Sequence, residues 1–271
     1  MALEELDIGY KTPLFQSITA KINRGLLVGL FGRNGIGKST LLHTLAGLQP
    51  PIGGKVMLLN RERAKWTLAE VAKHLAFVPS HPLRTPRLRV ADMVGIGRYG
   101  FTNWIGAHRE IDKESIHKAL EATSLSHLAY RDSATLSDGE WQRASIARSL
   151  AQDTPLILLD EPTAFLDMGN KYKVIYLLKE LTQKAQKGIL FSTHDLTLAL
   201  QVCDLLWIMT DDGFHADTPA QLIQEGVFDT LFSSDGLVFD RQTLGYHYAP
   251  IIFRIAAAKR RTPSSARSSD M

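Results

Sequence analysis

Short apolar runs alternate along the chain with longer stretches in which apolar residues recur every three or four positions. The short runs predict buried strands at residues 26–31, 55–59, 75–78, 156–159, 188–192 and 205–209. The longer stretches predict amphipathic helices at residues 39–48, 112–123, 137–151 and 171–184. Because buried strands alternate with helices, we expect an α/β fold with a mainly parallel core sheet.

The region of about 85–150 is rich in predicted helix and interrupts this alternation. We therefore expect a helical subdomain inserted into the sheet domain, which a chain of 271 residues can accommodate. Residues 259–271 are rich in Ser, Arg and Ala and are predicted to be disordered. Their basic charge is compatible with an arm that faces a membrane or binds nucleic acid. The simpler interpretation is a solvated chain end.

Composition excludes several classes of protein. The formal net charge of +3 is too small to indicate a nucleic-acid partner. The single cysteine, Cys203, allows no disulfide within the chain, which suits a reducing compartment. Its apolar surroundings in the sequence predict a buried thiol. The first residues lack the apolar core of a signal peptide, and Asp204 interrupts the longest apolar stretch, 196–209. We expect a soluble chain that reaches a membrane only through a partner.

A glycine-rich loop follows the predicted strand at 26–31. Gly32-x-x-x-x-Gly37-Lys38-Ser39 matches the P-loop pattern, with a strand before it and a helix after it. Its backbone N–H groups and the helix N-terminus would bind phosphates, Lys38 the outer ones, and the Ser39 hydroxyl would bind Mg²⁺. The predicted nucleotide-binding residues of the loop are Gly32, Arg33, Asn34, Gly35, Ile36, Gly37, Lys38, Ser39 and Thr40.

Catalytic candidates follow two further strands. Asp160 and Glu161 end the strand at 156–159 and would point to opposite faces, because successive strand residues do so. We expect Asp160 to hold Mg²⁺, directly or through water, and Glu161 to orient or deprotonate the attacking water. His194 follows the strand at 188–192 and would contact the γ-phosphate at the same sheet edge, although a lone histidine is also compatible with a structural role.

A second helix start has the features of an anion site. Ser137 is a favourable N-cap, and Glu140 three residues later completes a capping box. Gly139 would let a phosphate approach the backbone closely. Alone, this pattern indicates no more than a well-capped helix.

With the P-loop, however, the sequence Leu-Ser-Asp-Gly-Glu at residues 136–140 resembles the signature of the ABC (ATP-binding cassette) ATPases, usually Leu-Ser-Gly-Gly-Gln. The resemblance covers about residues 6–225. It implies a P-loop NTPase fold with a small N-terminal β subdomain beside the core sheet and the helical subdomain. It also implies an ATPase domain at residues 1–235 and a C-terminal extension at 236–258, with ATP and Mg²⁺ as cofactors.

The same resemblance implies how two copies assemble. In a head-to-tail homodimer, Ser137 and Gly139 of one copy would close on the ATP held by Lys38 of the other. Tyr10 resembles the aromatic residue that stacks on adenine, with a buried strand aromatic as the alternative. Asp167 resembles the acidic residue of the loop that crosses the dimer interface.

Three positions depart from the family pattern. Ser80 stands where the family has a glutamine that reaches Mg²⁺ and the attacking water, and we expect water or His81 to fill the gap. Asp138 replaces a signature glycine and places a negative charge near a phosphate site. Glu140 replaces the signature glutamine without loss of its capping role. Since the other site residues are present, the resemblance implies an active ATPase.

The predicted helical region indicates which subfamily of ABC ATPases the chain resembles. Residues 90–99 resemble a segment of importers for iron chelates (siderophores), haem and cobalamin. This implies an integral membrane permease as partner, docked at residues 79–106 on the cytoplasmic face of the inner or plasma membrane, and a substrate-binding protein outside as an indirect partner. Phe101, Trp104 and Ile105 would suit a docking patch or the core of the helical subdomain. The ATPase of another transporter (of a metal ion, or an exporter) and a soluble ABC ATPase are the alternatives.

Overall fold

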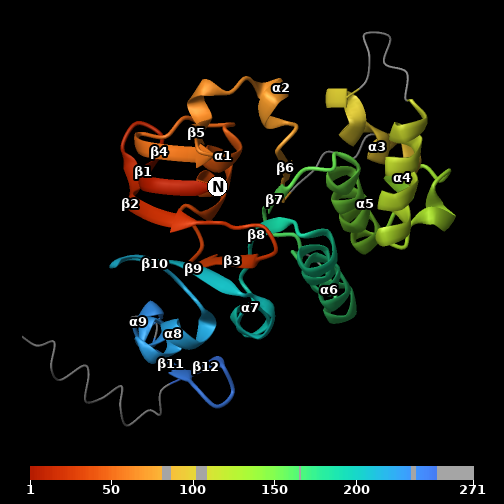
Figure 1. Ribbon diagram of the computed structural model, residues 1–271. Coiled ribbons are helices and arrows are strands. Elements are labelled where there is room, and N and C mark those ends of the chain that lie inside the picture. The colour runs from red at the N-terminus through yellow and green to blue at the C-terminus, as the bar shows by residue number, and fades with distance from the viewer. Residues whose placement is uncertain (81–86, 102–108, 165, 233–235, 249–271) are drawn as a thin grey trace, which may run out of the picture. The chain divides into compact units, whose positions relative to one another are not determined.

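The computed structural model describes residues 1–80, 87–101, 109–164, 166–232 and 236–248 (Figure 1). Two compact units make up the chain, Met1–Pro219 and Ala220–Met271. Among the described residues, no helix combines the length and apolar character that crossing a membrane requires.

The first unit contains a six-stranded sheet with the order β10-β9-β3-β8-β7-β6. Its strands are β3 (Leu27–Gly32), β6 (Leu75–Val78), β7 (Leu156–Leu159), β8 (Gly188–Ser192), β9 (Leu205–Thr210) and β10 (Gly213–Asp217). Five of them run parallel, and β10 pairs antiparallel with β9. The strands β3, β7 and β8 are buried along their whole length, which explains their uninterrupted apolar runs. The predicted mainly parallel core sheet is confirmed.

Helices α1 (Lys38–Ala46), α6 (Met168–Ala185) and α7 (Leu196–Val202) follow the strands β3, β7 and β8 of this sheet. The single turn η1 (Arg63–Lys65) and the short helix α2 (Leu68–Val71) precede β6. The P-loop helix α1 ends at Gly47, whose φ of 73° is a left-handed cap. The side chains of Asp167 and Asp195 accept hydrogen bonds at the starts of α6 and α7.

An antiparallel sheet forms the N-terminal β subdomain. Its order is β2-β1-β4-β5. The strands are β1 (Ala2–Gly9), β2 (Pro13–Lys21), β4 (Gly53–Leu58) and β5 (Arg61–Glu62). Leu6 and Ile8 of β1 lie in one apolar cluster with Leu41 and Leu45 of α1, so this sheet packs against the P-loop helix. The small β subdomain implied by the family resemblance is confirmed.

The helical subdomain has an apolar core of its own. Its elements are α3 (Val90–Gly95), η2 (Ile96–Phe101), α4 (Glu110–Ala122), η3 (Ser126–Leu128), η4 (Ser133–Thr135) and α5 (Asp138–Ala151). Val90 and Val94 of α3 pack in this core with Leu120 of α4 and Trp141 of α5. Figure 1 shows α3, α4 and α5 side by side, and α5 also contacts β6 of the core sheet. The predicted helical insertion is confirmed.

Most residues of the importer-like segment, 90–99, contribute to the packing of the helical subdomain. A Cβ on Gly97 would lie 2.1 Å from the carbonyl oxygen of Arg148 on α5, so only glycine fits there. Phe101 is half-buried, with the guanidinium carbon of Arg98 4.1 Å from its ring centroid. A half-buried Phe101 is compatible with both alternatives, the docking patch and the core of the helical subdomain, and Trp104 and Ile105 lie outside the described residues.

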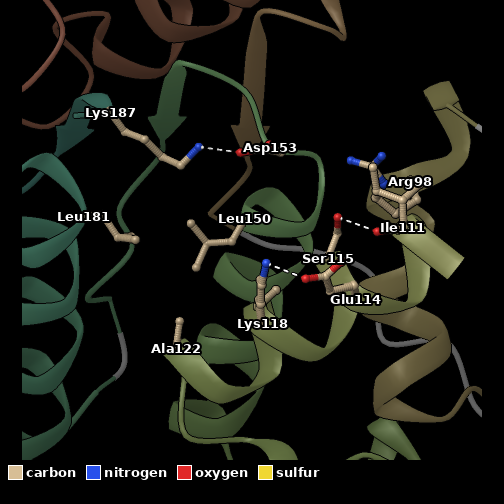
Figure 2. A pocket seen from close by; sticks show the side chains of 11 residues that line it. Arg98, Ile111, Glu114, Ser115, Lys118, Ala122, Leu150, Asp153, Leu181 and Lys187 are labelled. Atoms are coloured by element: carbon tan, nitrogen blue, oxygen red, sulfur yellow. Dashed lines mark hydrogen bonds and ion pairs between the residues drawn. The ribbon is translucent and has the colours of Figure 1, made fainter. Parts of the chain in front are cut away.

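A cavity of about 410 Å³ is lined by residues of this subdomain and by Leu181 and Lys187 of the sheet domain (Figure 2). Beside it, Arg98 forms a buried salt bridge of 2.9 Å with Asp112 of α4 and donates a hydrogen bond to the carbonyl of Ala151. On the sheet side, Lys187 donates hydrogen bonds to Asp153 and to the carbonyl of Thr154. Each buried cation thus has oxygen partners, as burial of a charge requires.

The second unit is small and rich in aromatic side chains. The helix α8 (Pro219–Gln224) begins at the boundary between the units, and α9 (Val227–Leu231) and the antiparallel pair β11 (Leu237–Asp240) and β12 (Gly245–Tyr248) follow. The hydroxyl of Tyr246 donates a hydrogen bond to the carbonyl of Phe228 at 2.8 Å. The division at Pro219 differs from the boundary expected at residue 235, which stays a prediction, and the tail at 259–271 lies outside the described residues.

Candidate nucleotide-binding site

The P-loop connects β3 to α1, as the sequence predicts. Gly35 and Gly37 have φ angles of 80° and 117°, which glycine adopts without strain. Gly37 is the N-cap of α1 and brings no side chain to the N–H groups of the first helical turn. These N–H groups and the helix dipole can bind a phosphate.

Lys38 is buried at the start of α1. Its ammonium donates hydrogen bonds to the carbonyl oxygens of Gly32 at 2.8 Å and Arg33 at 3.0 Å. Burial lowers the pKa of Lys38, while the negative charges of Glu161 and Asp160 oppose this shift. Lys38 therefore lies within the field of both carboxylates, although it is far from them in the sequence.

The strand order brings the other predicted residues to the same sheet edge. Since β8 lies between β3 and β7, and β6 follows β7, the carboxyl ends of these four strands are neighbours. His194 follows β8, Asp160 and Glu161 follow β7, and Ser80 follows β6. His81, the expected helper of Ser80, lies outside the described residues.

Asp160 and Glu161 have different environments. Asp160 is buried, whereas Glu161 is partly exposed and has a φ of 48°, an uncommon value for a residue with a side chain. Backbone strain of this kind concentrates at functional sites. The two neighbouring acids thus differ in burial and in backbone conformation, and the expectation that their side chains point to opposite faces stays a prediction.

Ser192, the last residue of β8, connects both acids and was missed in the sequence. Its hydroxyl donates a hydrogen bond to Asp160 Oδ1 at 2.7 Å, and its oxygen accepts one from the Glu161 amide at 2.8 Å. The available signal was a hydroxyl residue ending an apolar strand, directly before the segment that carries His194. Such a signal acquires meaning only when the neighbouring strand is known.

One cavity of about 460 Å³ gathers most of the predicted nucleotide-binding residues. Its lining residues are Tyr10, Leu14, Asn34, Gly35, Gly37, Lys38, Ser39, Thr40, Glu161 and His194. Tyr10 is 76% exposed, which excludes the alternative of a buried strand aromatic. His194 Nε2 lies 2.5 Å from Glu161 Oε1, so the histidine contacts the predicted catalytic acid. The size suits a small organic ligand.

Ser137 and Gly139 do not line this cavity. Ser137 is the N-cap of α5, and Gly139 is buried at its first turn. A Cβ on Gly139 would lie 3.0 Å from Cγ of Asn170, so the glycine also lets the starts of α5 and α6 approach each other. Asp167 caps α6 by accepting a hydrogen bond from the Asn170 amide at 2.9 Å. The signature and the predicted interface loop are therefore adjacent within one chain.

Comparison with known proteins identifies the family. The family model for ABC transporters matches residues 15–164. A Bacillus subtilis (strain 168) protein described as a probable siderophore transport system ATP-binding protein, YusV, is 39% identical over 235 residues, which is 86% of each chain. The chain belongs to the ABC transporter family. The ferric enterobactin transport ATP-binding protein FepC of Escherichia coli (strain K12) is 31% identical over 271 residues, covering 98% of this chain and 96% of FepC.

Solved ABC structures agree with this assignment. The chain is similar to an ABC transporter assigned to the metal-chelate type and captured in an inward-facing conformation, with a TM-score of 0.74, 28% identity and coverage of 92% of this chain and 96% of that one. It is also similar to the ATP-binding cassette MJ0796, solved as a dimer in a post-hydrolysis state with ADP and Pi, with a TM-score of 0.70, 25% identity and coverage of 80% and 98%. The protein is an ABC-type ATPase coupled to transport.

Proposed function

We propose that this ABC ATPase energises the import of an iron chelate, such as a siderophore, through a membrane permease. The observation that carries the proposal is the 39% identity to a siderophore transport ATP-binding protein over 86% of both chains. The similarity to FepC, named for ferric enterobactin transport, extends over nearly the whole chain and supports the same substrate class. Haem and cobalamin are the alternative substrates.

The cavity supports a specific division of roles in ATP hydrolysis. The P-loop amides and Lys38 bind the phosphates, and Tyr10 stacks on the adenine. Glu161 orients and deprotonates the attacking water, and His194, in contact with Glu161, reaches the γ-phosphate. Each of these residues lines the one cavity, which supports their joint action on one nucleotide.

We propose that Ser39 and Asp160 hold Mg²⁺ together with the nucleotide phosphates. Among the described residues, no group of three or more His, Cys, Asp or Glu side chains could bind a metal ion alone. This fits Mg²⁺, which proteins bind through one or two carboxylates and substrate phosphates rather than through a complete protein cage. The Ser192 hydroxyl fixes one oxygen of Asp160, and the other remains available to the ion or its water shell.

The proposed working unit is a head-to-tail homodimer on the cytoplasmic face of a permease. Ser137 and Gly139 lie outside the cavity of their own chain, which supports their action on the nucleotide of a second copy. MJ0796, similar to this chain, was solved as a dimer. A substrate-binding protein outside the membrane would deliver the chelate to the permease.

Uptake measurements test the proposal. In a strain that lacks this subunit, the wild-type chain should restore accumulation of radiolabelled ferric siderophore, whereas Lys38→Ala should not, because it removes the phosphate-binding ammonium. Haem and cobalamin, supplied separately, identify the substrate if the siderophore is wrong. Equal siderophore uptake with and without the subunit would overturn the proposed substrate class.

A further inference from the structure

The start of α5 carries its own anion. The Oε2 oxygen of Glu140 accepts a hydrogen bond from the Ser137 amide at 2.8 Å and another from the Ser137 hydroxyl at 3.0 Å. The Ser137 oxygen in turn accepts one from the Glu140 amide at 3.3 Å. Both donors of Ser137 are therefore directed at a single carboxylate oxygen of the same chain.

This arrangement conflicts with phosphate binding. A serine hydroxyl has one proton and donates one strong hydrogen bond at a time. While that proton is shared with Glu140, it is not available to a phosphate oxygen. A hydrogen bond to a carboxylate is charge-assisted, as one to a phosphate oxygen is, so Ser137 gains no stronger acceptor by the exchange. The exchange also deprives the Glu140 carboxylate of the Ser137 hydroxyl and places its negative charge beside that of the phosphate.

The surroundings keep Glu140 charged. The hydrogen bond from the Ser137 amide, followed by the one from the Ser137 hydroxyl and the positive charges of Arg131 and Arg143, lowers the pKa of Glu140 despite its partial burial. Asp138, exposed in the first turn of the same helix, adds a second negative charge. The positive end of α5 is therefore already partly neutralised before any nucleotide arrives.

We propose that Glu140 is a positioning residue that restrains closure of the cassette dimer, because Ser137 must exchange this carboxylate for a phosphate oxygen of the ATP held by the second copy. The inference rests on the head-to-tail arrangement proposed above. Glu140, in place of the signature glutamine, thus has a regulatory effect. The cassettes close less tightly on ATP than they would with an uncharged residue at this position.

The test measures ATP-driven dimerisation of the full chain. In a Glu161→Gln background, which slows hydrolysis, sedimentation velocity at a series of protein concentrations gives the dimer Kd with ATP and Mg²⁺. Adding Glu140→Gln should tighten the dimer at least about fivefold, because the amide keeps an acceptor for the cap but loses the charge. Thermal melting by circular dichroism verifies that the variant stays folded.

Two matched variants make the test specific. Glu70 forms the same capping box with Thr67 at the start of α2, so Glu70→Gln removes an equivalent charge and should leave the dimer Kd unchanged. Asp138→Asn removes a charge from α5 without freeing Ser137 and should have a smaller effect than Glu140→Gln. An equal effect of Asp138→Asn would overturn the inference, since charge alone would then explain the result.

The remaining outcomes separate this inference from the proposed function. An ATP-dependent dimer whose Kd is unchanged or weakened by Glu140→Gln would overturn the role of Glu140 and leave the head-to-tail arrangement standing. Absence of any ATP-dependent dimer in the Glu161→Gln chain would overturn that arrangement, and the role of Glu140 with it.

Discussion

The hydroxyl of Ser192 donates a hydrogen bond to Oδ1 of Asp160 at 2.7 Å, between the ends of two neighbouring strands. Ser192 is fully buried and Asp160 nearly so, so the bond forms away from solvent. The same serine oxygen accepts the Glu161 amide, which fixes the backbone of the predicted catalytic acid. One small side chain of β8 thus positions both the proposed Mg²⁺ ligand and the proposed base at the end of β7.

Ser192→Ala should therefore impair hydrolysis without preventing ATP binding. Loss of a residue that orients a metal ligand typically costs 10–100-fold in metal affinity or activity. We expect kcat to fall by about tenfold or more and the Mg²⁺ concentration for half-maximal activity to rise, as measured by phosphate release. Ser149→Ala is the matched control, because Ser149 is also buried but bonds to a carbonyl of α5. An unchanged Mg²⁺ dependence would remove Ser192 from the site.

The core sheet was the most predictable part of the fold. The strands β6, β7 and β8 have the bounds that the sequence predicts, because they are mostly or fully buried and read as continuous apolar runs. Strands β1 and β2 give no such run. Each has exposed positions, and the positive φ angles of Glu5 and Ser17 accompany register shifts that break the alternation of a half-buried strand.

The candidate site was predictable where residues lie within one motif. The P-loop carries its strand, glycines and lysine within a short segment, so local spacing suffices. The contact of His194 with Glu161 and the role of Ser192 depend on β8 lying beside β7, and strand order is not a local property. Similarly, the sequence gives no local signal that Asp112 pairs with Arg98, since the two residues lie in different elements.

Asp112→Asn should destabilise the helical subdomain. The change leaves the buried guanidinium of Arg98 without its charged partner, and breaking a buried pair in this way costs about 3 kcal/mol or more. Urea unfolding at pH 7 measures the difference. Glu114→Gln, on the same helix but at an exposed pair with Lys118, should change the free energy of unfolding by less than about 0.5 kcal/mol.

The loss of free energy of unfolding caused by Asp112→Asn should also depend on pH. Burial alone would raise the pKa of Asp112, but hydrogen bonds from the Arg109 amide and the Arg98 guanidinium lower it below the ordinary 3.8. A carboxyl whose pKa is lower in the folded state stabilises the fold above its unfolded pKa, and this contribution is lost as the pH falls through the folded pKa. The difference in free energy of unfolding between wild type and Asp112→Asn should therefore be constant above about pH 5 and become smaller below pH 3.8. A difference in free energy of unfolding that increases in acid would contradict the lowered pKa of Asp112.

Glu161→Gln should separate ATP binding from hydrolysis. The amide cannot accept the proton of the attacking water, so phosphate release should fall by about 100-fold or more. ATP should still bind, because the P-loop is unchanged, and the chain should accumulate as a dimer detectable by light scattering. Glu180→Gln, an exposed change on α6, should behave as wild type. A chain that hydrolyses normally would exclude Glu161 as the base, and a monomer with ATP would contradict head-to-tail closure.

Tyr10 should contribute to nucleotide affinity through its ring. It is 76% exposed beside the P-loop, where burial in the fold gives no reason for an aromatic residue. Stacking on a base contributes about 1–3 kcal/mol, so Tyr10→Ala should weaken ATP binding about tenfold in isothermal titration calorimetry, whereas Tyr10→Phe should preserve it. Tyr130→Ala, at a tyrosine 83% exposed on the helical subdomain, is the matched control and should bind ATP normally. Because every base presents a flat face, GTP should lose affinity to the same extent as ATP. Equal ATP affinity of Tyr10→Ala and wild type would show that the adenine lies elsewhere.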